Sequence, residues 1–170
     1  MARLASRRPT PAIAVDVTDR QRTLRLGQRW LSGIVRRALT REGITAAEIG
    51  ILLVNDRGIA ALHERWLDVP GPTDVITFDL ADGNDPGRLQ GDIVVSTETA
   101  ARTARSLGWN PRHEAAYYVV HGLLHLAGYD DHDAADRRAM RARERVLLTA
   151  CGLPAPPRTP AAPPSRGRRR

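Results

Sequence analysis

The sequence predicts an α+β, or mixed α/β, fold in which a small four-stranded mixed sheet is covered by about five helices. Four short segments show the alternation or the β-branched runs of strands, and five longer segments show helical periodicity. Along the chain they are ordered β-α-β-α-β-β-α-α-α. This mixture of strands and helices favours a layered domain in which helices cover a sheet.

The four strands are expected in segments with different degrees of burial. Residues 12–18 (AIAVDVT) alternate apolar and polar side chains, as a half-buried strand does. Residues 47–54 (AEIGILLV) are too short and too β-branched at their end for a helix, which indicates a more buried strand. Alternation returns in residues 73–80, and residues 91–97 (GDIVVST) form the fourth strand after a Gly- and Asp-rich loop at 81–87.

The expected helices are residues 24–42, 56–67, 97–107, 113–127 and 133–150. In the first of them, Trp30, Ile34 and Ala38 recur every four residues and form an apolar face. Gly43 stands where a helix C-terminus often places a glycine, and Asp133 is a candidate N-cap of the last helix.

Length and charge indicate one domain with charged ends. The chain has 170 residues, and we expect a domain at 12–151 between a disordered Arg-rich N-terminus (1–11) and a disordered Pro/Arg-rich tail (152–170). All 26 basic residues are arginines, and eight of them lie before residue 11 or after residue 157. The remaining 18 arginines face 19 acids, so the formal charge of +7 is weak evidence for nucleic-acid binding.

A stripe of arginines near the first helix is a candidate RNA contact. Arg22, Arg25, Arg29 and Arg36 recur at helical spacing, on a different face from the apolar one. Such a stripe can bind phosphates, but a solvated helix face is the commoner origin of the pattern.

The cysteine and hydropathy patterns favour a reducing, cytoplasmic location. Cys151 is the only cysteine, which excludes an intramolecular disulfide, and no apolar run approaches the ~20 residues of a membrane span.

The segment HEAAYYVVHGLLHLAGYDDH (113–132) contains the strongest functional signal. It reads as a buried helix, because Ala115 to Leu126 is apolar on almost every side, and His121 and His125 interrupt it. Four residues apart, the two imidazoles lie one turn apart on the same face and can share a metal. The alternative is a pair of core histidines, whose ring nitrogens would then each need another buried partner.

The turn after this helix offers a third metal ligand. Gly128 can end the helix in a left-handed conformation and return the chain toward the histidine pair. His132 would then complete a catalytic zinc site with three histidines and one water.

The motif HGLLHLAGYDDH resembles the signature of the YbeY family of metal-dependent endoribonucleases, His-Gly-x-Leu-His-Leu-x-Gly-Tyr-Asp-His. PTDVITF (72–78) and GDIVVS (91–96) are similar to two further family blocks in the same order. The resemblance implies a zinc-dependent endoribonuclease specific for single-stranded RNA, which matures the 3′ end of small-subunit ribosomal RNA and acts in ribosome quality control. It also implies ribosomal RNA and the small ribosomal subunit as partners.

Two positions depart from the family pattern. The family usually has its third histidine ten residues after the first, where this chain has Asp131, and His132 comes one residue later. We favour His132 as the ligand, because a turn accommodates one residue more easily than a site changes its ligand type, and keep Asp131 as the alternative. A functional arginine of the family falls on Leu67, and the nearby Arg65 should point elsewhere on its helix.

Supporting residues and rival functions remain open at this point. Glu114, seven residues before His121, either anchors the site from behind or is an ordinary ion-paired residue, and Asp92 either supports the site or stabilises its own strand. One rival is a ribosome-assembly factor that binds RNA and has a structural zinc with four protein ligands. A zinc peptidase is disfavoured, because such enzymes place a glutamate general base at the position of Gly122.

Overall fold

A computed structural model describes residues 13–81 and 88–157 of the chain. Within these residues the elements follow the predicted order, and the predicted fold class is confirmed. The predicted disorder of 1–11 and the greater part of the predicted tail lie outside the described residues, as does most of the loop expected at 81–87.

The sheet is mixed and has the strand order β1-β2-β4-β3. Its strands are β1 (Ile13–Asp19), β2 (Ala47–Val54), β3 (Val75–Asp79) and β4 (Leu89–Ser96). β1 and β4 both run parallel to β2, and β3 pairs antiparallel with β4 at one edge. The crossovers between the parallel strands contain helices, as is usual for parallel pairing.

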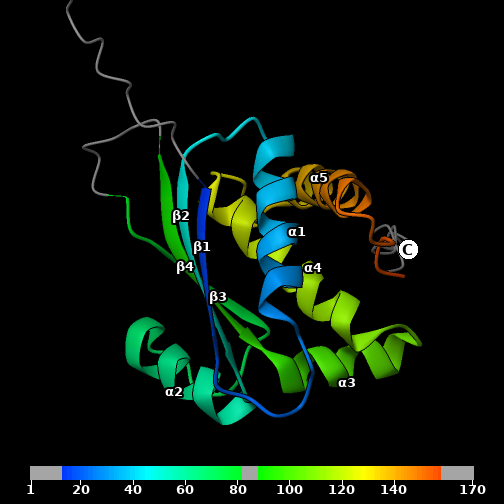
Figure 1. The fold of residues 1–170 in the computed structure, drawn as a ribbon. Coiled ribbons are helices and arrows are strands. Elements are labelled where there is room, and N and C mark those ends of the chain that lie inside the picture. Colours follow the sequence, from blue (N-terminus) through cyan, green and yellow to red (C-terminus); the bar gives the residue numbers. More distant parts are fainter. Residues whose placement is uncertain (1–12, 82–87, 158–170) are drawn as a thin grey trace, which may run out of the picture.

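Helices pack on both faces of this sheet (Figure 1). They are α1 (Gln28–Arg41), α2 (Asp56–Leu67), α3 (Thr97–Leu107), α4 (Pro111–Leu126) and α5 (Ala134–Ala150). The alternation of β4 shows how the faces are divided: Ile93 and Val95 belong to the core with α1 and α4, whereas Val94 packs with Ile59 of α2 on the opposite face.

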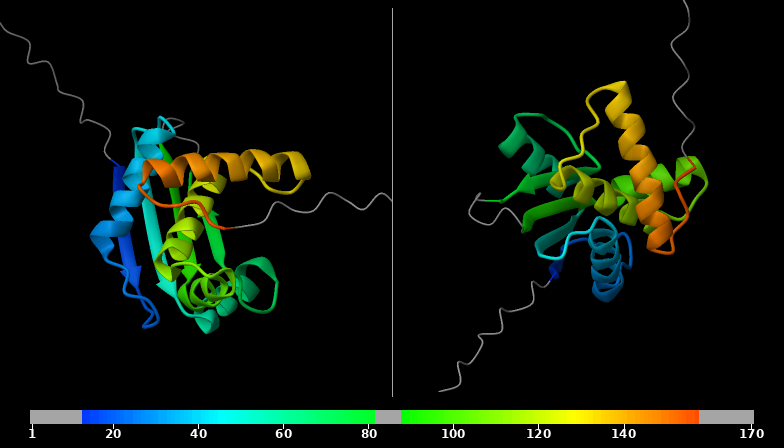
Figure 2. Two further views of the ribbon diagram at one scale, coloured as in Figure 1. Left: turned by 90° about the vertical axis from the view of Figure 1, so that its right-hand side faces the viewer. Right: turned by 90° about the horizontal axis from the view of Figure 1, so that it is seen from above.

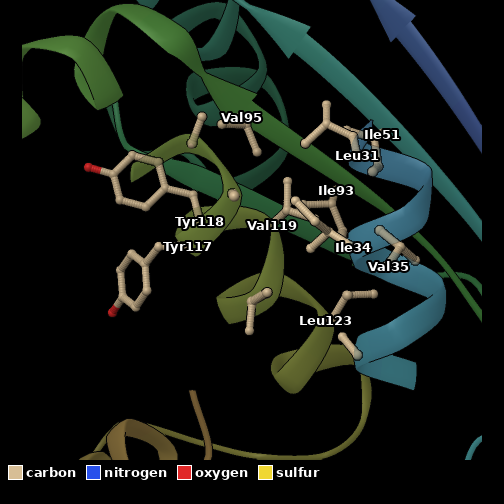
Figure 3. Close-up of a cluster of buried hydrophobic side chains, with 14 of the residues drawn as sticks. Leu31, Ile34, Val35, Ile51, Ile93, Val95, Tyr117, Tyr118, Val119 and Leu123 are labelled. Atoms are coloured by element: carbon tan, nitrogen blue, oxygen red, sulfur yellow. The ribbon is translucent and has the colours of Figure 1, made fainter. Parts of the chain in front are cut away.

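The main core lies where α4 packs between the sheet and α1. Figure 3 shows Val119 and Leu123 of α4 pointing toward Ile34 and Val35 of α1, with Ile93 of the sheet beside them. All of these side chains are at most 2% exposed. α4 is therefore fixed from several sides, which makes it a rigid base for functional side chains.

Most predicted boundaries hold to within two residues, but α1 begins at Gln28 rather than near residue 24. The side chain of Gln21 accounts for the difference, because its Oε1 accepts hydrogen bonds from the backbone N–H groups of Thr23 and Leu24 at 2.7 and 2.9 Å. This local turn competes with the helix. Arg22 and Arg25 therefore precede α1, and the expected helical stripe of four arginines does not exist as one helix face.

In the described part of the chain, no helix has the length and apolar character needed to cross a membrane.

Candidate metal centre

Helix α4 presents His121 and His125 near its C-terminus. It begins after Asn110, whose Oδ1 accepts the N–H of Arg112 at 2.9 Å, and Pro111 occupies its first turn. It ends where Gly128 adopts a φ of +90° and the N–H of Tyr129 bonds back to Leu124 at 2.9 Å. The helix thus ends at Leu126, just after His125, and Gly128 turns the chain, as the sequence predicts.

The two imidazoles converge on one point. His121 Nε2 and His125 Nε2 lie 3.1 Å apart, with side chains 19% and 28% exposed. Nitrogen ligands at 2.0–2.1 Å from a tetrahedral zinc would be separated by about 3.3 Å. The spacing of this pair fits a shared metal.

The other nitrogen of each ring is already engaged. His121 Nδ1 lies 2.7 Å from Glu144 Oε1, and His125 Nδ1 lies 3.2 Å from the backbone oxygen of Tyr129. Because a carboxylate and a carbonyl oxygen both accept, each ring can donate from Nδ1, and in that tautomer Nε2 carries the lone pair that binds a metal. Two such lone pairs on atoms 3.1 Å apart are an arrangement that a shared cation would stabilise.

The protonation state of His125 also favours metal binding. Burial lowers the pKa of His125 below its usual 6.5, and the neighbouring His121 lowers it further. Neutral imidazole is the form that binds a metal.

Asp131 is the third potential donor beside the pair. Its Oδ2 lies 4.0 Å from His121 Nε2, and its Oδ1 lies 4.0 Å from His125 Nε2. The three side chains form a group whose potential ligand atoms all lie within 4.8 Å of one another. Two imidazoles and one carboxylate are a donor set that zinc accepts.

His132 lies away from the helical pair in this structure. Its side chain is 87% exposed, and its Nε2 lies 3.4 Å from Asp130 Oδ1. Together with Asp131, these two residues form a second, mostly exposed group of possible metal donors. The structure thus brings together His121, His125 and Asp131 and leaves His132 outside that group.

The turn that presents Asp131 is anchored at both ends. At its start, the hydroxyl of Tyr129 donates to Glu42 Oε2 at 3.3 Å, and Arg143 of α5 pairs with the other oxygen of Glu42. At its end, Asp133 caps α5 by accepting the N–H groups of Ala135 and Asp136 at 2.6 and 2.8 Å, so the predicted N-cap is confirmed.

Glu144 is the carboxylate behind the site, and the sequence analysis missed it. It is 3% exposed and accepts from both His121 and the hydroxyl of Tyr117. A signal was available, because Glu144 occurs at helical spacing among the buried Met140, Leu147 and Leu148 of α5.

Glu114 is fully buried in the first turn of α4, and its Oε2 accepts from Trp109 Nε1 at 2.8 Å. Seven residues separate it from His121, which is about 10 Å along a helix. The position behind the ring of His121 is taken by Glu144, while Glu114 fixes the start of α4.

Other residues singled out in the sequence lie elsewhere. Asp92 is exposed on the sheet face opposite α4, where its Oδ1 covers Gly50. Leu67 is 51% exposed at the end of α2, and the guanidinium of Arg65 lies over the ring of Trp66 at 5.4 Å from its centroid. The structure does not bring Asp92 to the metal centre.

Comparison with known proteins gives a consistent result. The family model described as "Endoribonuclease YbeY" matches residues 15–152. A protein of that name from Anaeromyxobacter dehalogenans is 46% identical over 116 residues, which is 68% of this chain and 58% of the relative. Another from Moorella thermoacetica is 35% identical over 151 residues, covering 81% of this chain and 97% of the relative.

The match thus spans less than two thirds of the length of the Anaeromyxobacter relative. A solution structure of a Thermotoga maritima protein superimposes with a TM-score of 0.58 at 23% identity, covering 81% of this chain and 88% of that one. This likeness supports the fold alone.

Proposed function

The chain belongs to the YbeY family, and from this membership we propose that it is a metal-dependent endoribonuclease that hydrolyses single-stranded RNA. The observation that carries the proposal is the 3.1 Å approach of two histidine Nε2 atoms whose Nδ1 atoms are both engaged. We further propose Zn²⁺ as its metal, ribosomal RNA of the small subunit as its substrate, and the cytoplasm as its location. Maturation of the RNA 3′ end and ribosome quality control are the processes that the family resemblance implies.

For the metal ligands we propose His121, His125 and Asp131. The carboxylate of Asp131 lies within 4.0 Å of both Nε2 atoms, whereas the ring of His132 is exposed. Our sequence-based preference for His132 stays a prediction, and the zinc affinities of Asp131→Ala and His132→Ala test it.

A zinc ion bound by these residues would supply a Lewis acid and a water with a pKa near 7 for attack on a phosphodiester. The protein contributes orientation: Glu144 and the carbonyl of Tyr129 fix both rings through their Nδ1 atoms. Side chains that are 19–41% exposed leave one side of the centre accessible to an RNA strand.

The two rival functions are less well supported. A structural zinc needs four protein ligands, whereas the group around the helical pair contains three donors among the described residues. A peptidase would need a glutamate in place of Gly122, but a Cβ at that position would lie 2.9 Å from Ile93 Cγ2, against the sheet and away from the metal.

The test compares cleavage of an unstructured RNA with that of the matching duplex by the zinc-loaded protein. We expect the protein to cleave the single strand in preference to the duplex. Cleavage should be lost in His121→Ala, in His125→Ala and in the presence of a chelator. His63→Ala, which changes a histidine on α2, is the matched control and should retain activity. Cleavage that survives in both metal-site variants would refute the proposal.

A further inference from the structure

A groove between α1 and α5 is lined by arginines that the proposed chemistry does not use. It consists of two adjoining hollows of about 590 and 370 Å³ that share Arg41 and Ala150. Arg36 and Arg37 of α1 and Arg145 of α5 complete its basic rim. We call this surface the α1–α5 groove.

The charge of this groove is not compensated by nearby acids. No acidic residue lines either hollow. Among the described residues, no carboxylate lies within the 4.0 Å ion-pair distance of any of the four guanidinium groups. Arg143 of α5 contrasts with them, because it pairs with Glu42. Four exposed cations therefore face one hollow surface.

Helix stabilisation explains only one of these arginines. Arg41 lies in the last turn of α1, where a cation offsets the partial negative charge of the helix end. Arg36 and Arg37 precede that turn, and Arg145 precedes the last turn of α5, which contains no basic residue. Arg36 donates from Nε to the backbone oxygen of Ile13 at 3.4 Å, and Arg37 lies beside the thiol of Cys151, but neither partner is a carboxylate that would neutralise a guanidinium. The positive charges of Arg36, Arg37 and Arg145 therefore stay available to an external anion.

We propose that the α1–α5 groove binds the sugar–phosphate backbone of single-stranded RNA. Guanidinium groups match phosphate oxygens with paired hydrogen bonds. The floor is apolar, with Val146 38% exposed beside Ala142 and Ala150, so it can accept the less polar parts of a nucleotide. Only the identity of the polyanion rests on the proposed endoribonuclease function.

Helix α5 connects the groove with the metal centre. Glu144 faces His121, and the next residue, Arg145, lines the groove on another side of the same helix. Arg138, Arg141 and Arg145 follow one another at spacings of three and four residues, so they lie along one side of α5 over about 10 Å. As Figure 2 shows, α5 leads from the turn after α4 to α1. An RNA strand cut at the metal centre can follow this path.

The test measures RNA binding without cleavage. Metal-free protein in chelator is titrated against a fluorescein-labelled, unstructured RNA, and anisotropy gives Kd over a range of salt concentrations. The variant is Arg41→Glu with Arg145→Glu. The control is Arg57→Glu with Arg105→Glu, two exposed arginines on α2 and α3 at the other end of the molecule (Figure 1). Both double variants change the net charge equally.

Each lost single-strand phosphate contact should reduce the slope of log K against log salt concentration by about 0.7, so the two substitutions should reduce it by about 1.4. At 0.1 M salt this change corresponds to RNA binding that is about 25-fold weaker in the groove variant. The control variant should lose much less affinity and slope. Circular dichroism verifies folding, and Arg41→Gln with Arg145→Gln replaces the charge reversal if that variant does not fold.

Equal losses of RNA affinity in both double variants would refute the groove as the binding site and leave only non-specific charge attraction. Unchanged RNA affinity in the groove variant would refute it as well. Failure of the proposed function has a different signature, since the zinc-loaded protein would then bind RNA through the groove and leave it uncut.

Discussion

Replacing Glu144 by glutamine should weaken zinc binding about tenfold while leaving the fold intact. Glu144 Oε1 accepts from His121 Nδ1 at 2.7 Å and from the hydroxyl of Tyr117 at 3.1 Å. Glutamine keeps an accepting oxygen of the same shape but loses the negative charge. A hydrogen bond to a charged group exceeds a neutral one by about 1 to 1.5 kcal/mol, and 1.4 kcal/mol corresponds to tenfold in affinity.

Glu144→Ala removes the accepting oxygen as well, so its loss should approach 100-fold, the upper end for partners that orient a metal ligand. Tyr117→Phe is the matched control, because it removes the other contact of the same oxygen and leaves His121 in place. Its effect on zinc affinity should be the smallest of the three.

The assay is competition for zinc against a chromophoric chelator at fixed pH, with thermal unfolding as the check on folding. Folded Glu144→Gln and Glu144→Ala proteins that bind zinc like the unchanged chain would refute the reasoning. His121 would then not depend on Glu144 for its orientation.

Three other changes test the remaining parts of the site and fold. Asp131→Ala should lower zinc affinity more than 100-fold in the same competition assay and His132→Ala only about twofold, and the reverse order would support His132 as the ligand in place of Asp131. The midpoint of thermal unfolding of the metal-free chain should fall as the pH drops below 6.5, because the pKa of His125 is lower in the folded state and the unfolded state therefore binds the proton first. An unchanged midpoint, or the same fall in His125→Asn, would contradict this role of His125. Gly91→Ala should reduce the free energy of unfolding, measured in urea, by about 1 to 3 kcal/mol, because the new Cβ would lie 2.7 Å from a methyl group of Leu126 and from the backbone oxygen of Phe78. Gly33→Ala is the control, and its effect on the free energy of unfolding should be neutral or stabilising.

The fold was predictable because local patterns and global packing agree. Alternation and a short β-branched run placed the strands, and the apolar run from Ala115 to Leu126 predicted a helix that is buried on nearly every side. The start of α1 was misjudged because the side chain of Gln21 forms a turn that hydrophobic periodicity does not reveal.

The site was predictable only in its local part. His121 and His125 share one helix, so their spacing alone indicates that they converge. Glu144 comes from another helix, and its contact with His121 depends on how α5 crosses α4, which no local pattern contains. The same limit applies to the α1–α5 groove, where Arg145 joins arginines more than one hundred residues earlier in the chain.

The proposed third ligand illustrates how backbone position can favour one of two neighbouring residues. Tyr129 is held through its hydroxyl and its carbonyl oxygen, and Asp133 is held by the N-cap of α5. Arg137 also donates to the backbone oxygens of residues 131 and 132, at 3.1 and 2.7 Å. These anchors limit the freedom of the chain to bulge, which supports the residue ten positions after His121 as the one that lies beside the pair. In this chain that residue is Asp131, and His132, one position later, is directed to solvent.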